Sequence, residues 1–327
     1  MSLLTSAATR FRGRNPAGRQ IQHTGRARSP FECELRNVAL LLLMLLGWAL
    51  PGLAKNEESA PGRSVFHQAA LTDLQRASIY DRSKLHFENA LLIKPAMHST
   101  TNQIALRFAP LIIQEAVSTN TEAQAERDLF GIVAGVNTGS NTVVMPQVFF
   151  RSGKVTLNRK PHAQITYCWF YPTENSTNRN ALMQQGVRVT LDSAGRPVIW
   201  EVLADTSSAR LIFVSQEVEA AAMKEFGRPL SRRRLVVERS VEETPNVVVG
   251  RVVDDGPEPM GPIMYLRAGT RDTSTIICRC MDSQAKAVVE MRYYQLTPAV
   301  GRNADLIKAT AFGTNDLGHW LRLPHDF

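Results

Sequence analysis

The segment Gly186–Leu203 constrains the fold most, because apolar and polar residues alternate on both sides of a turn sequence. Its first half reads GVRVTL and its second half reads PVIWEVL, with residues 192–195 (DSAG) between them. A period of two places every second side chain on the same face of a strand. Gly195 suits the positive φ that tight hairpin turns require. The segment therefore predicts a β-hairpin with one buried face.

Other stretches follow the same pattern. Residues 154–157 and 162–171 predict a second hairpin around 158–161, in which Ile165, Tyr167, Trp169 and Tyr171 share one face. Helices are expected at 66–93, 217–226 and 282–293, and further strands are expected at 142–151, 211–215, 235–238, 247–253, 263–267 and 274–278. At residues 104–117, Pro110 predicts a break or a strand followed by a short helix. Because the strands come in hairpins, the predicted fold class is α+β, a helical N-terminal part packed on a mainly antiparallel sheet.

Composition divides the chain into five parts. Residues 1–36 predict a basic disordered leader, 37–54 a signal peptide and 55–64 a flexible linker. Residues 65–130 are expected to be a mainly helical segment, and residues 131–327 a mixed, strand-rich α+β domain. The pattern leaves open whether residues 65–130 form a domain of their own.

The apolar run at residues 38–50 predicts a targeting segment rather than an element of the folded core. It reads VALLLLMLLGWAL, with Arg36 before it and the small residues Gly52 and Ala54 where a signal peptidase reads. A membrane-spanning helix needs about 20 apolar residues, more than this run offers. We expect cleavage after Ala54 and an extracytoplasmic location, periplasmic or secreted. The alternative is an uncleaved anchor formed by residues 38–54, in which case a membrane would be a partner.

The net charge of +8 does not predict a nucleic-acid partner, because much of it lies in the leader. Residues 1–54 hold seven arginines and two acidic residues, whereas the remainder holds 31 basic and 28 acidic residues. Only Ser231-Arg232-Arg233-Arg234 is a local basic run, which fits a loop beside a strand. No other partner can be assigned from the sequence.

The common catalytic and cofactor motifs are absent. The sequence contains no GxGxxG, phosphate-binding loop, HExxH, EF-hand loop or GxSxG, so no catalytic residue and no cofactor is assigned. Asp254-Asp255-Gly256 has the acidity of a cation-binding loop but fits turn chemistry better within DDGPEP. Glu201 stands on a predicted strand without the partner carboxylate that glycosidase chemistry requires.

Three cysteines form the candidate site. Cys278 and Cys280 in TIICRCMD project to the same face of an extended strand, and Arg279 with a helix start would favour their thiolates. They fit a redox pair, a soft-metal site, or plain buried residues. A disulfide from Cys168 to one of them is a further possibility. We predict that Cys168 lies near the pair, because a disulfide needs Cα atoms within about 7 Å.

These observations favour an exported binding or structural module without enzymatic activity. The alternative is a thiol redox or metal-handling protein that uses the Cys278/Cys280 pair.

Overall fold

The alternating segment at residues 186–203 folds as predicted into two antiparallel strands, β5 (Leu182–Leu191) and β6 (Pro197–Val202). Gly195 lies in the turn between them with a φ of 77°. The hairpin belongs to a computed structural model that describes residues 70–84, 86–98, 100, 102–116, 130–131, 145–172, 182–279, 285–300, 304 and 316–327. The leader, the signal-peptide prediction and the linker lie outside these residues.

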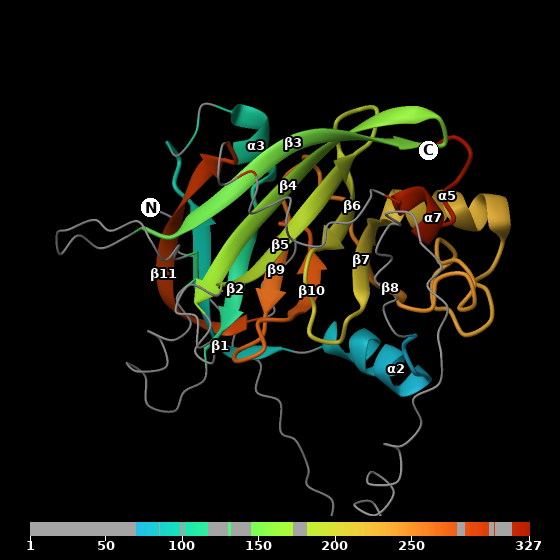
Figure 1. Ribbon diagram of the computed structural model, residues 1–327, viewed down its shortest axis with the longest axis horizontal. Helices are drawn as coiled ribbons and strands as arrows, with labels where there is room; N and C mark the ends of the chain where they lie inside the picture. The colour runs from blue at the N-terminus through green and yellow to red at the C-terminus, as the bar shows by residue number, and fades with distance from the viewer. Residues whose placement is uncertain are drawn as a thin grey trace, which may run out of the picture. The chain divides into compact units, whose positions relative to one another are not determined.

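The described residues form four helices and eleven strands (Figure 1). The helices are α2 (Asp73–Arg82), α3 (Gln103–Phe108), α5 (Gln216–Phe226) and α7 (Leu317–Trp320). Besides β5 and β6, the strands are β1 (Phe87–Pro95), β2 (Leu111–Glu115), β3 (Gln147–Leu157), β4 (Lys160–Pro172), β7 (Arg210–Ser215), β8 (Val247–Val253), β9 (Ile263–Leu266), β10 (Thr273–Ile277) and β11 (Ala285–Pro298).

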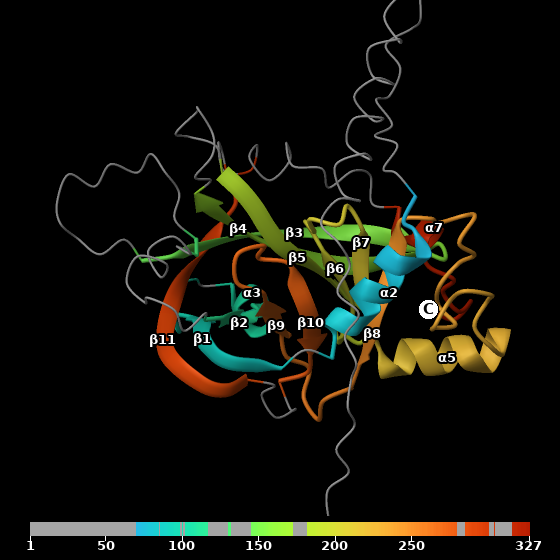
Figure 2. The same cartoon turned by 90° about the horizontal axis from the view of Figure 1, so that it is seen from below.

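All eleven strands belong to one mixed sheet, which corrects the predicted fold class. The strand order is β10-β9-β2-β1-β11-β3-β4-β5-β6-β7-β8, and the sheet curls until it is nearly closed into a barrel (Figure 2). Four of the ten pairings are parallel: β1 with β11, β11 with β3, β2 with β9, and β7 with β8. The prediction of an α+β protein with a helical N-terminal part on a mainly antiparallel sheet is therefore wrong.

Two segments predicted as helices cause most of this error. Among the described residues from 70 to 93, only Asp73–Arg82 is helical, and Phe87–Pro95 is strand β1. Short apolar runs do not distinguish a buried strand from a buried helix by periodicity alone. Within 282–293, the described residues from Ala285 onward belong to β11. Its sequence AKAVVEMRYY is rich in β-branched and aromatic residues, and pairing with β1 holds it extended.

Two smaller predictions also change. Residues 235–238 form turns rather than a strand, and Glu238 makes one isolated bridge to Leu321. At residues 104–117 the order is reversed, with helix α3 before strand β2. The Asn102 side chain accepts a hydrogen bond from the Ala105 N–H at 2.9 Å, and this cap starts α3 ahead of Pro110.

Alternation along β4 separates the two faces of the sheet, as the sequence predicted. Ile165, Tyr167, Trp169 and Tyr171 lie in the main core inside the curled sheet. Cys168 and Phe170 lie in a small cluster on the opposite face. Helices α5 and α7 cover an outer core over β6, β7 and β8, which includes Ile199, Ile212, Val249, Val218 and Leu317. The sheet therefore buries apolar surface on both faces, which is the main stabilisation of the fold.

The two edge strands of the curled sheet, β8 and β10, approach each other, and helix α2 contacts both (Figure 2). Arg82 at the end of α2 forms a bidentate ion pair with Asp205 at 2.8 and 3.1 Å. Arg76 donates to the carbonyl of Pro245 at 3.0 Å. Helix α2 is thus held across the gap by polar contacts, and its Ile79 and Tyr80 also pack in the main core.

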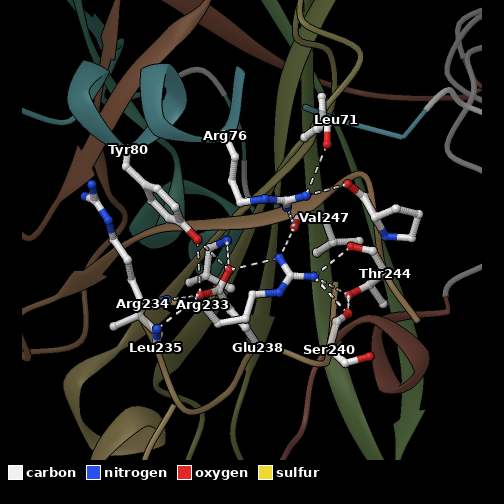
Figure 3. A network of polar contacts seen from close by, with 12 residues as sticks. Leu71, Arg76, Tyr80, Arg233, Arg234, Leu235, Glu238, Ser240, Thr244 and Val247 are labelled. Carbon is white, nitrogen blue, oxygen red and sulfur yellow. Dashed lines mark hydrogen bonds and ion pairs between the residues drawn. The ribbon is translucent and has the colours of Figure 1, made fainter. Parts of the chain in front are cut away.

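A buried polar network underlies α2 (Figure 3). One carboxylate oxygen of Glu238 accepts hydrogen bonds from the Tyr80 hydroxyl at 3.0 Å and the Val249 N–H at 3.2 Å. The other accepts from the N–H groups of Arg234 and Leu235, each at 3.0 Å. Arg233, whose side chain is fully buried, donates to the Val247 carbonyl at 2.7 Å. The network therefore satisfies charged groups that burial would otherwise penalise strongly.

Candidate functional site

The loop at residues 254–262 (DDGPEPMGP) joins β8 to β9 and is held at two points. On one side, the Asp255 carboxylate accepts a hydrogen bond from the Glu217 N–H in the first turn of α5, at 3.1 Å. On the other side, Arg107 of α3 donates to the Pro259 carbonyl at 2.7 Å, and the Gly261 N–H donates to the Arg107 carbonyl at 3.0 Å. The loop is therefore anchored to α5 on one side and to α3 on the other, and it forms one wall of the cavity described next.

A cavity of about 200 Å³ lies against this loop, and we call it the first cavity. Its apolar lining comes from β6, β8, the loop and the end of β10. This lining includes Val198, Trp200, Val253, Met260, Ile277 and four prolines. Trp200 is only 4% exposed, and its Nε1 donor has no hydrogen-bond partner among the described residues. The cavity thus has an aromatic and aliphatic wall, and the Nε1 donor of Trp200 is enclosed within that wall.

The charged lining of the first cavity is mostly acidic. It contains the carboxylates of Glu217, Asp254, Asp255 and Glu258, against the single guanidinium of Arg196. Arg196 is already paired with Glu217 at 2.8 Å and with Asp192 at 2.7 Å. Burial raises the pKa of the Asp255 carboxyl above its ordinary value. Arg251, outside the lining, approaches the Asp254 carboxylate at 3.9 Å. Because the four carboxylates still outnumber these two guanidinium groups, the lining favours positive charge in the cavity.

A second cavity of about 300 Å³ lies on the other side of Arg196 and Glu217. Helix α5, the turn at 192–196, the start of β4 and residues 324–327 surround it. His162 of β4 is 4% exposed, and its ring stacks on Phe327 with centroids 4.9 Å apart. Its Nδ1 lies 3.1 Å from the Leu191 carbonyl oxygen, while Nε2 has no partner within the described part of the chain.

Cys168 and Cys278, the two predicted site cysteines that the structure describes, pack in different clusters. Cys168 is a free thiol in the outer cluster with Phe149 and Phe170, and it accepts a hydrogen bond from Gln184. Burial raises the pKa of this thiol to about 12, so its thiolate is scarce at neutral pH. Cys278 packs against the main core, lines the first cavity and is disulfide-bonded. Cys280 lies outside the described residues, as does Cys33, so the partner of Cys278 lies there too.

The other sequence candidates have structural partners. Glu201 is buried against Arg188 at 3.3 Å on the outer face of the sheet. Desolvation raises its pKa, and the nearby guanidinium groups of Arg188 and Arg210 counter that effect. Asp255 accepts a hydrogen bond from the start of α5, a contact that the sequence did not predict, and the described residues contain no cluster of three metal-ligating side chains.

Sequence reasoning missed both cavities. Their linings come from segments far apart in the chain, including Lys160–His162, Arg196, Glu217 and the 254–262 loop. One signal was present, because the acidic DDGPEP stretch and the acidic start of α5 (QEVE) stand close to the ends of predicted strands. That pattern shows two acidic segments, but it does not show that they lie next to each other in the fold.

Comparisons with known proteins assign no family. No family model, curated protein sequence or solved structure matches the chain. None of the helices in the described ranges has the length and apolarity that crossing a bilayer requires. The candidate site therefore has to be interpreted from its own geometry.

Proposed function

We propose that the chain is an exported binding module that holds a small organic cation in the first cavity. The observation that carries this proposal is the lining itself, an apolar wall with Trp200 beside four carboxylates and one arginine. Protein sites for small molecules are usually concave and apolar with a few placed polar groups. An aromatic side chain beside acidic groups is also the chemistry that binds ammonium ions.

The size of the cavity limits the ligand. A volume of about 200 Å³ lies below the range of roughly 300–1,000 Å³ that drug-sized ligands occupy. The ligand is therefore a small amine, or a single basic side chain of a larger molecule.

Calorimetric titration with benzylammonium, and with benzyl alcohol as its neutral counterpart, tests the proposal. We expect benzylammonium to bind at least about tenfold more tightly, and added salt to reduce the difference. The Glu258→Gln variant should weaken benzylammonium binding and leave benzyl alcohol unchanged. Glu88→Gln is the matched control, because Glu88 is an exposed residue of β1 that pairs with Lys286. Equal affinity for the amine and the alcohol would contradict the proposal.

Export is tested separately by sequencing the N-terminus of the protein recovered from an extracytoplasmic fraction. We expect the mature chain to begin at Lys55. A recovered chain that still begins before Val38 would rule out cleavage at this site.

A second function, thiol redox chemistry, is favoured by one observation: the disulfide-bonded Cys278 lines the same cavity. Structural disulfides in secreted proteins have reduction potentials below about −300 mV, and catalytic ones lie higher. Thiol labelling of Cys278 in glutathione or dithiothreitol buffers of known potential separates the two. A potential in the structural range would reject the redox function and leave the binding proposal intact.

A further inference from the structure

The first and second cavities share three lining residues, Arg196, Val198 and Glu217. The Arg196–Glu217 ion pair thus stands between the cavities, with a nitrogen–oxygen distance of 2.8 Å. Both side chains are about half exposed, at 47% and 52%. Exposed ion pairs of this kind are weak, so the partition can open without disturbing the core.

The second cavity is acidic as well. Asp192, Asp326 and the shared Glu217 face Lys160 and the shared Arg196. Lys160 already donates to the backbone carbonyl of Asp326 at 2.8 Å. Taken together, the two cavities contain six carboxylates and two basic side chains, on a chain whose residues after position 54 hold 31 basic and 28 acidic side chains, a net charge of +3. Negative charge is thus concentrated at this site against the charge of the whole chain.

His162 is a further polar residue in the lining of the second cavity. A carbonyl oxygen can only accept, so the hydrogen bond with Leu191 requires Nδ1 to carry the hydrogen. In the neutral ring, Nε2 is then an acceptor, and it has no donor among the described residues although the side chain is almost fully buried. An ammonium group has three donors and no acceptor, so it matches the carboxylates that line the cavity.

We propose that the two cavities form one site for a ligand with two ammonium groups joined by an apolar spacer. One ammonium lies among the carboxylates of the first cavity. The other lies in the second cavity near His162 and Asp326, and the spacer passes Val198. A free diamine and a peptide with two lysine side chains both carry this chemistry. The inference rests on the cation-binding function proposed for the first cavity.

The test compares α,ω-diaminoalkanes with n-alkylamines of equal length, titrated calorimetrically into the full chain. We expect diamines to exceed the matched monoamines by at least about tenfold at some spacer length between about three and ten carbons. Dilysine with its N-terminus acetylated and its C-terminus amidated carries two ammonium groups and is the second arm, and tighter binding of it than of every diamine identifies a peptide as the ligand class.

Asp326→Asn is the decisive variant, because Asp326 is exposed and its loss leaves the core unchanged. The Asp326→Asn variant should lose most of the difference in affinity between diamines and monoamines, and its affinity for monoamines should be unchanged. Glu88→Gln again controls for the change in net charge.

The possible failures are distinguishable. Diamines that bind no more than about twofold better than monoamines at every length would overturn the two-cavity site, because two equivalent groups alone give that factor. The single-cavity function would then stand. If no amine of either series binds, both proposals are overturned.

Discussion

Glu238 accepts a hydrogen bond from the backbone N–H of Val249 at 3.2 Å, on the edge of β8 that no strand of the described residues covers. Arg233 donates to the Val247 carbonyl on the same strand. Two side chains thus take the hydrogen-bonding places that a neighbouring strand would fill. The network in Figure 3 therefore terminates the sheet at β8, and it also holds helix α2 in place.

The carboxylate of Glu238 should be the most sensitive point of this network. Glu238→Ala leaves Arg233 buried without its carboxylate, and we expect a loss of about 3–5 kcal/mol in the free energy of unfolding. Tyr80→Phe removes one hydrogen bond and should cost about 1–1.5 kcal/mol. Urea denaturation measures both. An equal cost for the two variants would show that the ion pair contributes nothing.

Alkaline pH should destabilise the fold through its buried tyrosines. Burial is the largest cause that raises the pKa of Tyr80, Tyr167 and Tyr294 above the ordinary value. A raised folded-state pKa means that the folded state holds the proton more tightly. The stability is thus fully present below the unfolded pKa of about 10 and falls as pH rises above it. Urea unfolding followed from neutral pH to pH 11 should show this fall, and Tyr80→Phe should make it shallower.

Gly261 is predicted to fix the wall of the first cavity. A Cβ at this position would collide with the backbone carbonyls of Phe108 and Ala109, which cannot swing aside as a side chain can. We expect Gly261→Ala to cost about 1–3 kcal/mol and to weaken benzylammonium binding as the loop shifts. Gly153→Ala is the matched control, since a Cβ there meets nothing within 4 Å. Thermal melting measures the loss of stability, and calorimetry measures the affinity for benzylammonium. If the Gly261→Ala protein is destabilised but binds with wild-type affinity, the position of the loop does not affect binding.

Binding of a cation should depend on pH through Asp255. Burial raises the pKa of this carboxyl, so it gains its proton at a higher pH than an ordinary aspartate. Affinity for benzylammonium should therefore fall as pH is lowered through that raised pKa, while affinity for benzyl alcohol stays level. Calorimetry at successive pH values measures the profile. A benzylammonium affinity that does not change on acidification would remove Asp255 from the site.

Cys168 should be inert in the folded protein. Its thiol is buried, and its pKa of about 12 leaves little thiolate to react. Iodoacetamide at neutral pH should leave Cys168 unmodified until a denaturant is added, as mass spectrometry of the tryptic peptides can show. Rapid alkylation of the native protein would mean that β4 opens at this point.

Local chemistry predicted the parts of the fold that depend on neighbours in sequence. Residues 192–195 specify the β5–β6 turn, and Gly227 ends α5 with a φ of 83°. The position of β11 could not be obtained this way, because its partner β1 lies nearly two hundred residues earlier in the chain. Propensity alone leaves such a segment undecided between helix and strand.

The arginine run at 232–234 shows the same limit for single residues. Its three members differ completely in the structure: Arg232 is an exposed partner of Asp73, Arg233 is fully buried, and Arg234 stacks over Tyr80. The candidate site was out of reach for a related reason, because its carboxylates meet only when β8, α5 and the turn at 192–196 are packed together.

The position of helix α2 between β8 and β10 has a consequence for the behaviour of the protein in a crowded solution. Strands of other molecules can pair with the exposed edge of a sheet. Proteins prevent this by covering such edges or by placing charged side chains on them. Here, the contacts of Arg76, Tyr80 and Arg82 keep α2 over that gap. A chain that loses these contacts exposes strand edges while most of its core is intact, so intermolecular β-pairing and aggregation should precede complete unfolding.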